Sequence, residues 1–254
     1  MGFNTWNLYG CSVDSQILKD TALAMNKSGL QAAGYTYVNS DDCWMNKERD
    51  ANGNQVANPT KFPDGFQDVT AYIHGFGLKS GLYTAKGPST CAGFAASCQH
   101  EAQDALLWAS WGIDYVKDDS CSNCRNDDNL DYHTMWLAIQ ASGREMVLSI
   151  EGGPSYENFT AGLLGNAHRV GHDITPEFNS MLSLVDIGSG LWPFAHNATT
   201  TPENGGVFND LDMIGKFNRP PRLSFFFSFF FVFLLTTSSS SSFSPLVCIR
   251  FYPS

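Results

Sequence analysis

The sequence predicts an α/β protein of the (β/α)8 TIM-barrel class, and three observations support this prediction. Short runs rich in aromatic and β-branched residues alternate with longer segments of helical periodicity, which indicates βαβ units and a parallel sheet. These units recur about every 35 residues, the spacing that a barrel of roughly 250 residues requires. Polar residues follow the strands, at the end of a barrel where functional sites lie.

Seven strands can be assigned in chain order, at residues 2–6, 35–39, 79–84, 113–118, 146–151, 168–173 and 208–213. Helices are expected at residues 15–27, 66–74, 100–111, 131–141 and 175–184, where longer helical patterns lie between the strands. No eighth strand can be assigned, so we expect a barrel that is truncated after strand seven. A doubly wound sheet is the second possibility, but no GxGxxG or GxxxxGKS/T loop follows a strand, which argues against nucleotide binding.

The charge is concentrated in the first 215 residues. The whole chain has 15 Lys and Arg and 25 Asp and Glu, a net charge of −10. Four of the basic residues and none of the acidic ones lie in residues 216–254, so residues 1–215 carry a net charge of −14. An acidic surface of this size argues against nucleic acids and anionic membranes as partners and suits a neutral or cationic small substrate.

Residues 216–254 form a low-complexity tail rich in Phe and Ser, with ten of the 19 phenylalanines. Its apolar run, residues 225–235, is shorter than the roughly 20 residues of a membrane-spanning helix, so a membrane anchor is an alternative that we do not favour. The codons for Phe, Ser, Leu and Pro are largely pyrimidine, as in a non-coding tract. We therefore expect residues 1–215 to be the folded domain and the tail to be a gene-model artefact or disordered.

The cysteines and sequons indicate passage through the secretory pathway. Six of the seven cysteines precede residue 125, and an even set predicts three disulfides. Three glycosylation sequons begin at Asn26, Asn158 and Asn197. Because no signal peptide precedes Met1, we expect the N-terminus to be truncated as well.

An apolar strand runs into Lys117, Asp118 and Asp119. Side chains alternate along a strand, so Lys117 and Asp119 share a face and Asp118 points to the other. The lysine would hold Asp119 ionised, as a carboxylate nucleophile requires. On spacing alone, a structural ion pair that closes the strand is the simpler interpretation.

With these residues in view, the chain resembles the α-galactosidase and α-N-acetylgalactosaminidase family, glycoside hydrolase family 27, over nearly all of residues 1–215. The resemblance rests on six motifs in the same order, at residues 1–7, 37–44, 81–83, 111–121, 169–174 and 209–213. It implies a retaining glycosidase with Asp119 as nucleophile and Asp173 as acid/base, the two carboxyls about 5–5.5 Å apart. An acid/base that keeps its proton suits an acidic compartment, so we expect the lysosome, the vacuole or the extracellular space.

The resemblance also implies how a sugar is held. Asp41 and Asp42 would accept hydrogen bonds from the 4- and 6-hydroxyls; a Mg²⁺ or Ca²⁺ site is the alternative, which we disfavour because neighbours on a strand point to opposite sides. Glu151 would lie near the 2-position and favour galactose over its N-acetyl form. Trp6, alternatively an ordinary core residue, would stack on the sugar. The other residues expected to contact the sugar are Tyr83, Lys117, Arg169 and Asp212.

The same comparison pairs Cys11 with Cys43 and Cys91 with Cys121, which leaves Cys98 with Cys124. The chain also departs from the family pattern. Asp118 occupies a normally aromatic position, so it faces the helices, or the substrate if the strand twists. Ile150-Glu151-Gly152 replaces Cys-Glu-Trp, and Gly165 replaces the partner of that cysteine. Lys86 is a further departure, and the C-terminal β-sandwich of the family is expected to be missing.

We therefore expect a retaining exo-α-galactosidase that acts on terminal α-galactosyl residues and needs no cofactor or metal. Within the family, the alternatives are an α-N-acetylgalactosaminidase and a β-L-arabinopyranosidase. An inactive galactose-binding remnant is the alternative from another class. The sequence leaves a homodimer open.

Overall fold

The computed structural model describes residues 1–151, 164–197 and 208–213. The chain divides into two units, Met1–Phe217 and Asn218–Ser254, and every described residue belongs to the first. The Phe- and Ser-rich tail that was predicted from composition lies outside the described residues, as does the sequon at Asn158.

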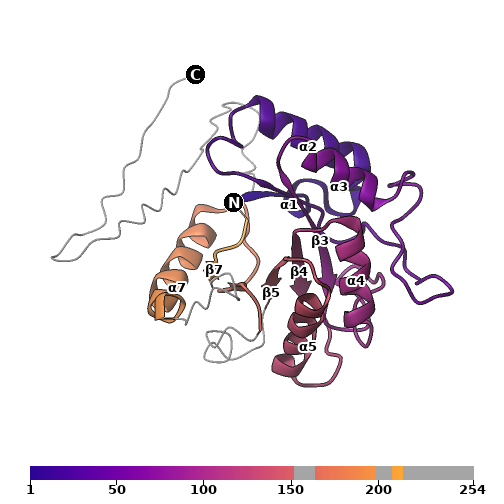
Figure 1. The fold of residues 1–254 in the computed structure, drawn as a ribbon. Helices are drawn as coiled ribbons and strands as arrows, with labels where there is room; N and C mark the ends of the chain where they lie inside the picture. Colours follow the sequence, from indigo (N-terminus) through magenta and orange to yellow (C-terminus); the bar gives the residue numbers. More distant parts are fainter. Residues whose placement is uncertain (152–163, 198–207, 214–254) are drawn as a thin grey trace. The chain divides into compact units, whose positions relative to one another are not determined.

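One seven-stranded parallel sheet organises the described residues (Figure 1). Its strands are β1 (Gly2–Asn4), β2 (Tyr37–Asn39), β3 (Lys79–Ala85), β4 (Tyr115–Asp119), β5 (Val147–Ile150), β6 (Ala167–Arg169) and β7 (Phe208–Asp210). Each strand pairs in parallel with the next one along the chain, from β1 to β7. This consecutive order is that of a (β/α)8 barrel and excludes the doubly wound alternative, in which the strand order reverses.

Helices precede or follow the strands as predicted. They are α1 (Trp6–Tyr9), α2 (Ser15–Lys27), α3 (Phe66–His74), α4 (Glu101–Trp111), α5 (Asp128–Ala141) and α7 (Phe178–Asn197), with a 3-10 turn η1 at Gly10–Ser12. The predicted bounds of α2 and α3 are confirmed. Among the described residues, none of these helices has the length and apolarity to cross a membrane.

Side chains decide where α2 and α5 begin. The carboxylate of Asp14 accepts a hydrogen bond from the backbone N–H of Ile17 (2.8 Å) and caps α2. Asp127 does the same for Leu130 (3.2 Å), so α5 begins at Asp128 rather than at residue 131. A cap of this kind can be recognised in the local sequence, but the predicted start of α5 was one turn too late.

Three predicted strands end two or more residues early, which changes the setting of three candidate residues, Trp6, Asp173 and Asp212. Asn4 Oδ1 accepts a hydrogen bond from the N–H of Trp6 (2.9 Å) and turns the chain into α1, so Trp6 is helical. The sixth strand is Ala167–Arg169 rather than 168–173, so Asp173 lies in the loop beyond it. The seventh ends at Asp210, whose Oδ1 accepts from the N–H of Asp212 (2.8 Å).

The core lies between the sheet and the helices that cover it. Alternation along the strands places Leu82, Val116 and Leu148 in register on the helix side, and all three are fully buried. Helices contribute the opposing residues Leu18, Ala22, Phe66, Val69, Ile73, Trp108, Tyr132, Met135 and Ile139. The register puts Thr84, Asp118 and Ile150 one step further along the same side.

Three disulfides join loops at the carboxyl ends of the strands. They pair Cys11 with Cys43, Cys91 with Cys121 and Cys98 with Cys124, at Cα–Cα distances of 5.1, 5.2 and 5.3 Å. The first two are the pairs that the resemblance implied and the third is the pair that remained, and all three distances are normal for a disulfide. The second one fixes the segment directly after Asp119.

Candidate active site

The site is arranged around two cationic centres, the side chains of Lys117 and Arg169, and Lys117 is the first of them. It lies on β4 on the side opposite Asp118, and its Nζ is 3.0 Å from both Asp41 Oδ2 and Glu151 Oε1. The ammonium also lies 5.2 Å from the centroid of the Tyr83 ring. Burial opposes the charge, but the carboxylates of Asp41, Glu151 and Asp119 outweigh it and raise the pKa of Lys117. The lysine therefore joins the ends of β2, β4 and β5 as a permanent cation.

Asp119, the predicted nucleophile, takes its hydrogen bonds from other groups. The Tyr83 hydroxyl donates to its Oδ2 (2.8 Å), and the backbone N–H of Ser120 donates to its Oδ1 (2.6 Å). Burial and the Asp119 carboxylate raise the pKa of Tyr83, so its phenol stays a donor. The prediction of a Lys117–Asp119 ion pair is therefore wrong in detail, because the direct partners of Lys117 are Asp41 and Glu151.

Asp118 faces the helices, away from this site. Its side chain is fully buried, and neither carboxylate oxygen has a hydrogen-bond partner among the described residues. Burial raises the pKa of Asp118 well above its usual value, and the nearby carboxylates of Asp119 and Glu101 act in the same direction. The alternative in which strand twist would turn Asp118 toward a substrate is excluded.

Arg169 is the second centre. Its Nη1 donates to Glu151 Oε1 (2.8 Å), and its Nη2 lies 2.9 Å from Asp173 Oδ1 and 3.0 Å from Asp212 Oδ2. Although burial opposes it, Glu151 and Asp212 raise the pKa of Arg169. The guanidinium thus brings three predicted site residues together from β5, the loop after β6 and the segment after β7.

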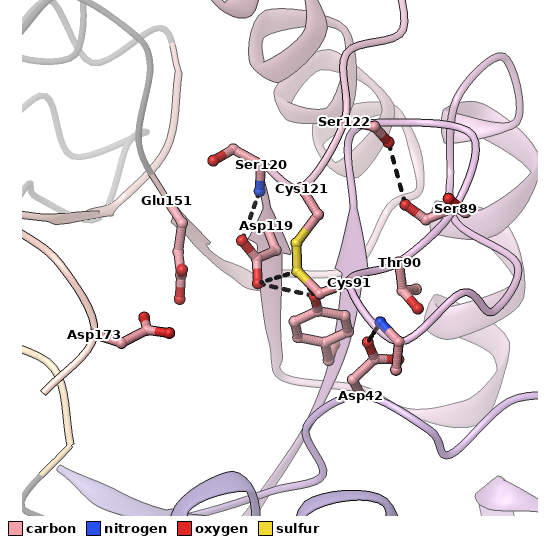
Figure 2. Close-up of a disulfide and its surroundings, with 12 residues drawn as sticks. Asp42, Ser89, Thr90, Cys91, Asp119, Ser120, Cys121, Ser122, Glu151 and Asp173 are labelled. Carbon is pink, nitrogen blue, oxygen red and sulfur yellow. Dashed lines mark hydrogen bonds between the residues drawn. A yellow bond between two sulfur atoms is a disulfide. The ribbon is translucent and has the colours of Figure 1, made fainter. Parts of the chain in front are cut away.

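An open pocket of about 430 Å³ lies beside this arginine. The Asp173 side chain is 83% exposed and opens into the pocket, whereas that of Asp212 is 4% exposed. Figure 2 shows Asp119, Glu151 and Asp173 around one shared space. The pocket is lined by Ser120, Glu151, Arg169, Gly171, His172 and Asp173.

Glu151 links the two centres through one oxygen, which contacts both Lys117 and Arg169. Burial raises the pKa of Glu151 to about 7, with Lys117 and Arg169 opposing and Asp119 adding to the rise. Burial likewise raises the pKa of Asp212, against the effect of Arg169. Buried carboxyls beside fixed cations are a common feature of functional sites.

Asp41 and Asp42 are held by different hydrogen-bond partners. Asp41 Oδ2 accepts from Asn4 Nδ2 (2.8 Å) and from Lys117. Asp42 accepts from the backbone N–H of Cys43 (2.6 Å) and of Ala92 (2.9 Å), and burial raises its pKa. Asp41 is thus paired with the cation of Lys117, whereas Asp42 is held by backbone N–H groups.

One grouping of three potential metal ligands occurs among the described residues: Cys91, Asp119 and Cys121. Because the two cysteines form a disulfide, the group offers a single carboxylate.

Among the described residues, no direct contact joins two of the predicted sugar contacts, Trp6 and Asp42, to Lys117 or Arg169. Trp6 is partly exposed in α1, directly after β1. Conversely, the sequence did not single out Asn4, Ser120 or Tyr132, which contact Asp41, Asp119 and the Glu151 carbonyl. Their position at a strand end was the available signal for the first two, Asn4 acting through its side chain and Ser120 through its backbone N–H, whereas Tyr132 reaches Glu151 from a helix.

The fold and the site define a protein of the (β/α)8-barrel class, with seven strands described and acidic residues around two cations, Lys117 and Arg169, at the carboxyl ends of the strands. Comparison with known proteins gives the family. A family model described as Alpha galactosidase A matches residues 1–219, and the chain belongs to that family.

Two similar relatives are the probable alpha-galactosidase of Dictyostelium discoideum, 42% identical over 217 residues, and alpha-galactosidase A of Cellvibrio japonicus, 41% identical over 226 residues. Both alignments cover 84% of this chain and 54% of the relative, so the chain spans about half the length of these curated relatives. Among solved structures, alpha-galactosidase I from Mortierella vinacea matches with a TM-score of 0.76 and 35% identity, over 84% of this chain and 58% of that one.

Proposed function

We propose that this chain carries the catalytic site of a retaining exo-α-galactosidase. The observation that supports this most is the arrangement of three carboxyls at the carboxyl ends of the strands: Arg169 binds Glu151 and Asp173, and Tyr83 and Ser120 hold Asp119 across the same space. The names of the relatives point to the same substrate, a terminal α-galactoside.

In the first step, a carboxylate oxygen of Asp119 attacks the anomeric carbon while the bond to the leaving oxygen breaks. Asp173, exposed in the pocket, gives its proton to that oxygen. The product is a galactosyl ester of Asp119. The hydrogen bonds from Tyr83 and Ser120 orient the attacking carboxylate.

In the second step, Asp173 takes a proton from water, and the water oxygen attacks the anomeric carbon. The ester bond to Asp119 breaks, and galactose leaves with its original configuration after two inversions. Arg169, 2.9 Å from Asp173, keeps this carboxyl in place through both steps.

Selectivity is assigned to the buried carboxylates. A buried acceptor rejects a sugar that leaves it unpaired, so Asp41 and Asp42 select the 4- and 6-hydroxyls of galactose. Glu151, held between Lys117 and Arg169, is assigned the 2-position, where it would exclude an acetamido group. We place Trp6 against the apolar face of the sugar.

The kcat/KM values on nitrophenyl α-galactoside and on its N-acetyl analogue test this proposal. We expect the complete gene product to prefer the galactoside by at least about 100-fold, because the bulkier sugar would displace Glu151 from both cations. A preference for the N-acetyl analogue would favour an α-N-acetylgalactosaminidase. Binding of galactose without turnover of either substrate would favour the galactose-binding remnant.

The setting of the enzyme is part of the proposal. Three disulfides support folding in an oxidising compartment, and we propose the secretory pathway with delivery to a lysosome, a vacuole or the cell exterior. A homodimer is a further proposal, which a light-scattering mass of the complete gene product would decide.

A further inference from the structure

Three buried polar side chains lie on the helix side of the sheet, directly behind the site. Asp118 comes from β4, Lys86 follows β3, and Tyr132 comes from α5. The side chain of Lys86 is 1% exposed, and Asp118 and Tyr132 are fully buried. The proposed mechanism uses none of them.

The strand register explains why Lys86 and Asp118 occur together. Thr84 is the registered partner of Asp118, and Lys86 follows Thr84 by two residues, so its side chain returns to the same side of the sheet. The backbone N–H of Lys86 still pairs with the Asp119 carbonyl (3.0 Å), which continues the ladder to this point. Lys86 therefore supplies a buried cation diagonally next to a buried carboxyl that has no hydrogen-bond partner among the described residues.

Lys86 also contacts the first turns of α5. Its ammonium pairs with Asp128 and lies 5.2 Å from the centroid of the Tyr132 ring. The contact with the ring face is of the cation–π type, which is stronger where water is excluded. The lysine thus limits the movement of the phenol ring.

The Tyr132 hydroxyl donates a hydrogen bond to the Glu151 carbonyl. The N–H of Glu151 donates to the Asp118 carbonyl (3.2 Å), so both backbone groups of Glu151 are fixed by neighbours. Burial and the carboxylates of Asp118, Asp119 and Glu151 raise the pKa of Tyr132, which keeps it a donor. The Glu151 carboxylate then reaches Lys117 and Arg169 from a backbone that cannot shift freely.

We propose that Tyr132 is a positioning residue for Glu151, and that Lys86, on the same helix side of the sheet, keeps Tyr132 in place. The inference rests on the proposed function, in which Glu151 faces the 2-hydroxyl of galactose. It assigns part of the selectivity at the 2-position to a helix residue that touches no substrate.

The test compares the complete gene product with its Tyr132→Phe, Glu151→Gln and double variants. The readout is the ratio of kcat/KM on nitrophenyl α-galactoside to that on the 2-deoxy analogue, with Kd values for galactose and 2-deoxygalactose as a second readout. We expect Tyr132→Phe to lower this ratio about 10-fold, because the loss of one hydrogen bond changes a rate or binding constant by about that factor. Only kcat/KM on the galactoside should fall, and kcat/KM on the 2-deoxy analogue should stay the same. The double variant is expected to fall no further than the worse single variant, because Tyr132 acts through Glu151.

Lys86→Met, which keeps the apolar stem and removes the charge, is expected to lower the same ratio by a smaller factor. Matched controls are Tyr72→Phe, a partly exposed tyrosine of α3, and Lys79→Met, an exposed lysine at the start of β3. Both controls are expected to leave the ratio unchanged.

An equal loss on both substrates, or a fully additive double variant, would overturn the inference and leave the proposed function intact. If the wild-type protein neither hydrolyses the galactoside nor binds galactose, the proposed function fails first and the inference fails with it. Binding without hydrolysis still tests the inference, through the ratio of the two Kd values.

Discussion

Asp118 and Asp119 are neighbours on one strand, yet their surroundings are opposite. Asp119 receives hydrogen bonds from Tyr83 and Ser120 at the open end of the site, while Asp118 is buried among helices with no hydrogen-bond partner in the described part of the chain. The alternation of side chains along a strand produces this difference. Asp119 is therefore placed to react with a ligand, whereas its neighbour Asp118 is costly to ionise.

Asp118 makes stability depend on pH. Its pKa in the folded protein lies well above the usual 3.8 because of burial, so the folded protein binds its proton more tightly than the unfolded chain does. The resulting destabilisation is absent below about pH 3.8, grows as the pH rises through that value, and levels off above the folded pKa.

We expect Asp118→Asn, which resembles the protonated acid, to stabilise the protein at pH 7 by at least about 1 kcal/mol and to have little effect near pH 3.5. Urea unfolding at the two pH values measures this, with Asp64→Asn, at an exposed position, as the control. A variant that is less stable than wild type at pH 7 would show that Asp118 is ionised and paired in the folded protein.

At the scale of elements, the contact between β5 and the segment before β6 explains why the chain departs from the family pattern at both Ile150 and Gly165. A Cβ on Gly165 would lie 3.1 Å from the Leu148 carbonyl oxygen and 3.3 Å from Ile150 Cγ2. The fully buried Ile150 side chain thus occupies the space next to Gly165. Ile150 and Gly165 thus pack against each other at the two positions where the family pattern has a pair of cysteines.

We expect Gly165→Ala to destabilise the protein by about 1–3 kcal/mol, because the added methyl group overpacks a closed site. The same change at Gly190, in α7, meets no atom within 4 Å and is expected to stabilise by about 0.5–1 kcal/mol through helix propensity. Thermal unfolding of the two variants shows whether each substitution lowers or raises the stability of the protein. A neutral or stabilising Gly165→Ala would mean that β5 can move away from this segment.

At the scale of the whole molecule, the strand order and the two central helices α2 and α3 could be predicted, because their hydrophobic periods are strong. The early ends of the strands at Asn4 and Arg169 could not, since both side chains bond to backbone groups two residues further on, the Trp6 N–H and the Gly171 carbonyl. Strand alternation predicted the direction of Lys117 correctly. Its partners Asp41 and Glu151 follow from contacts across the sheet, which no local pattern encodes.

One measurement tests the proposed roles of Asp119 and Asp173 together. In an Asp173→Asn variant of the complete gene product, nitrophenyl α-galactoside should still transfer its sugar, because nitrophenolate leaves without a proton, but the second step lacks its base. After an acid quench, digestion and peptide mass analysis, we expect a galactosyl group on the peptide that contains Asp119. A galactosyl group on another carboxylate, or normal turnover with no trapped peptide, would contradict the account.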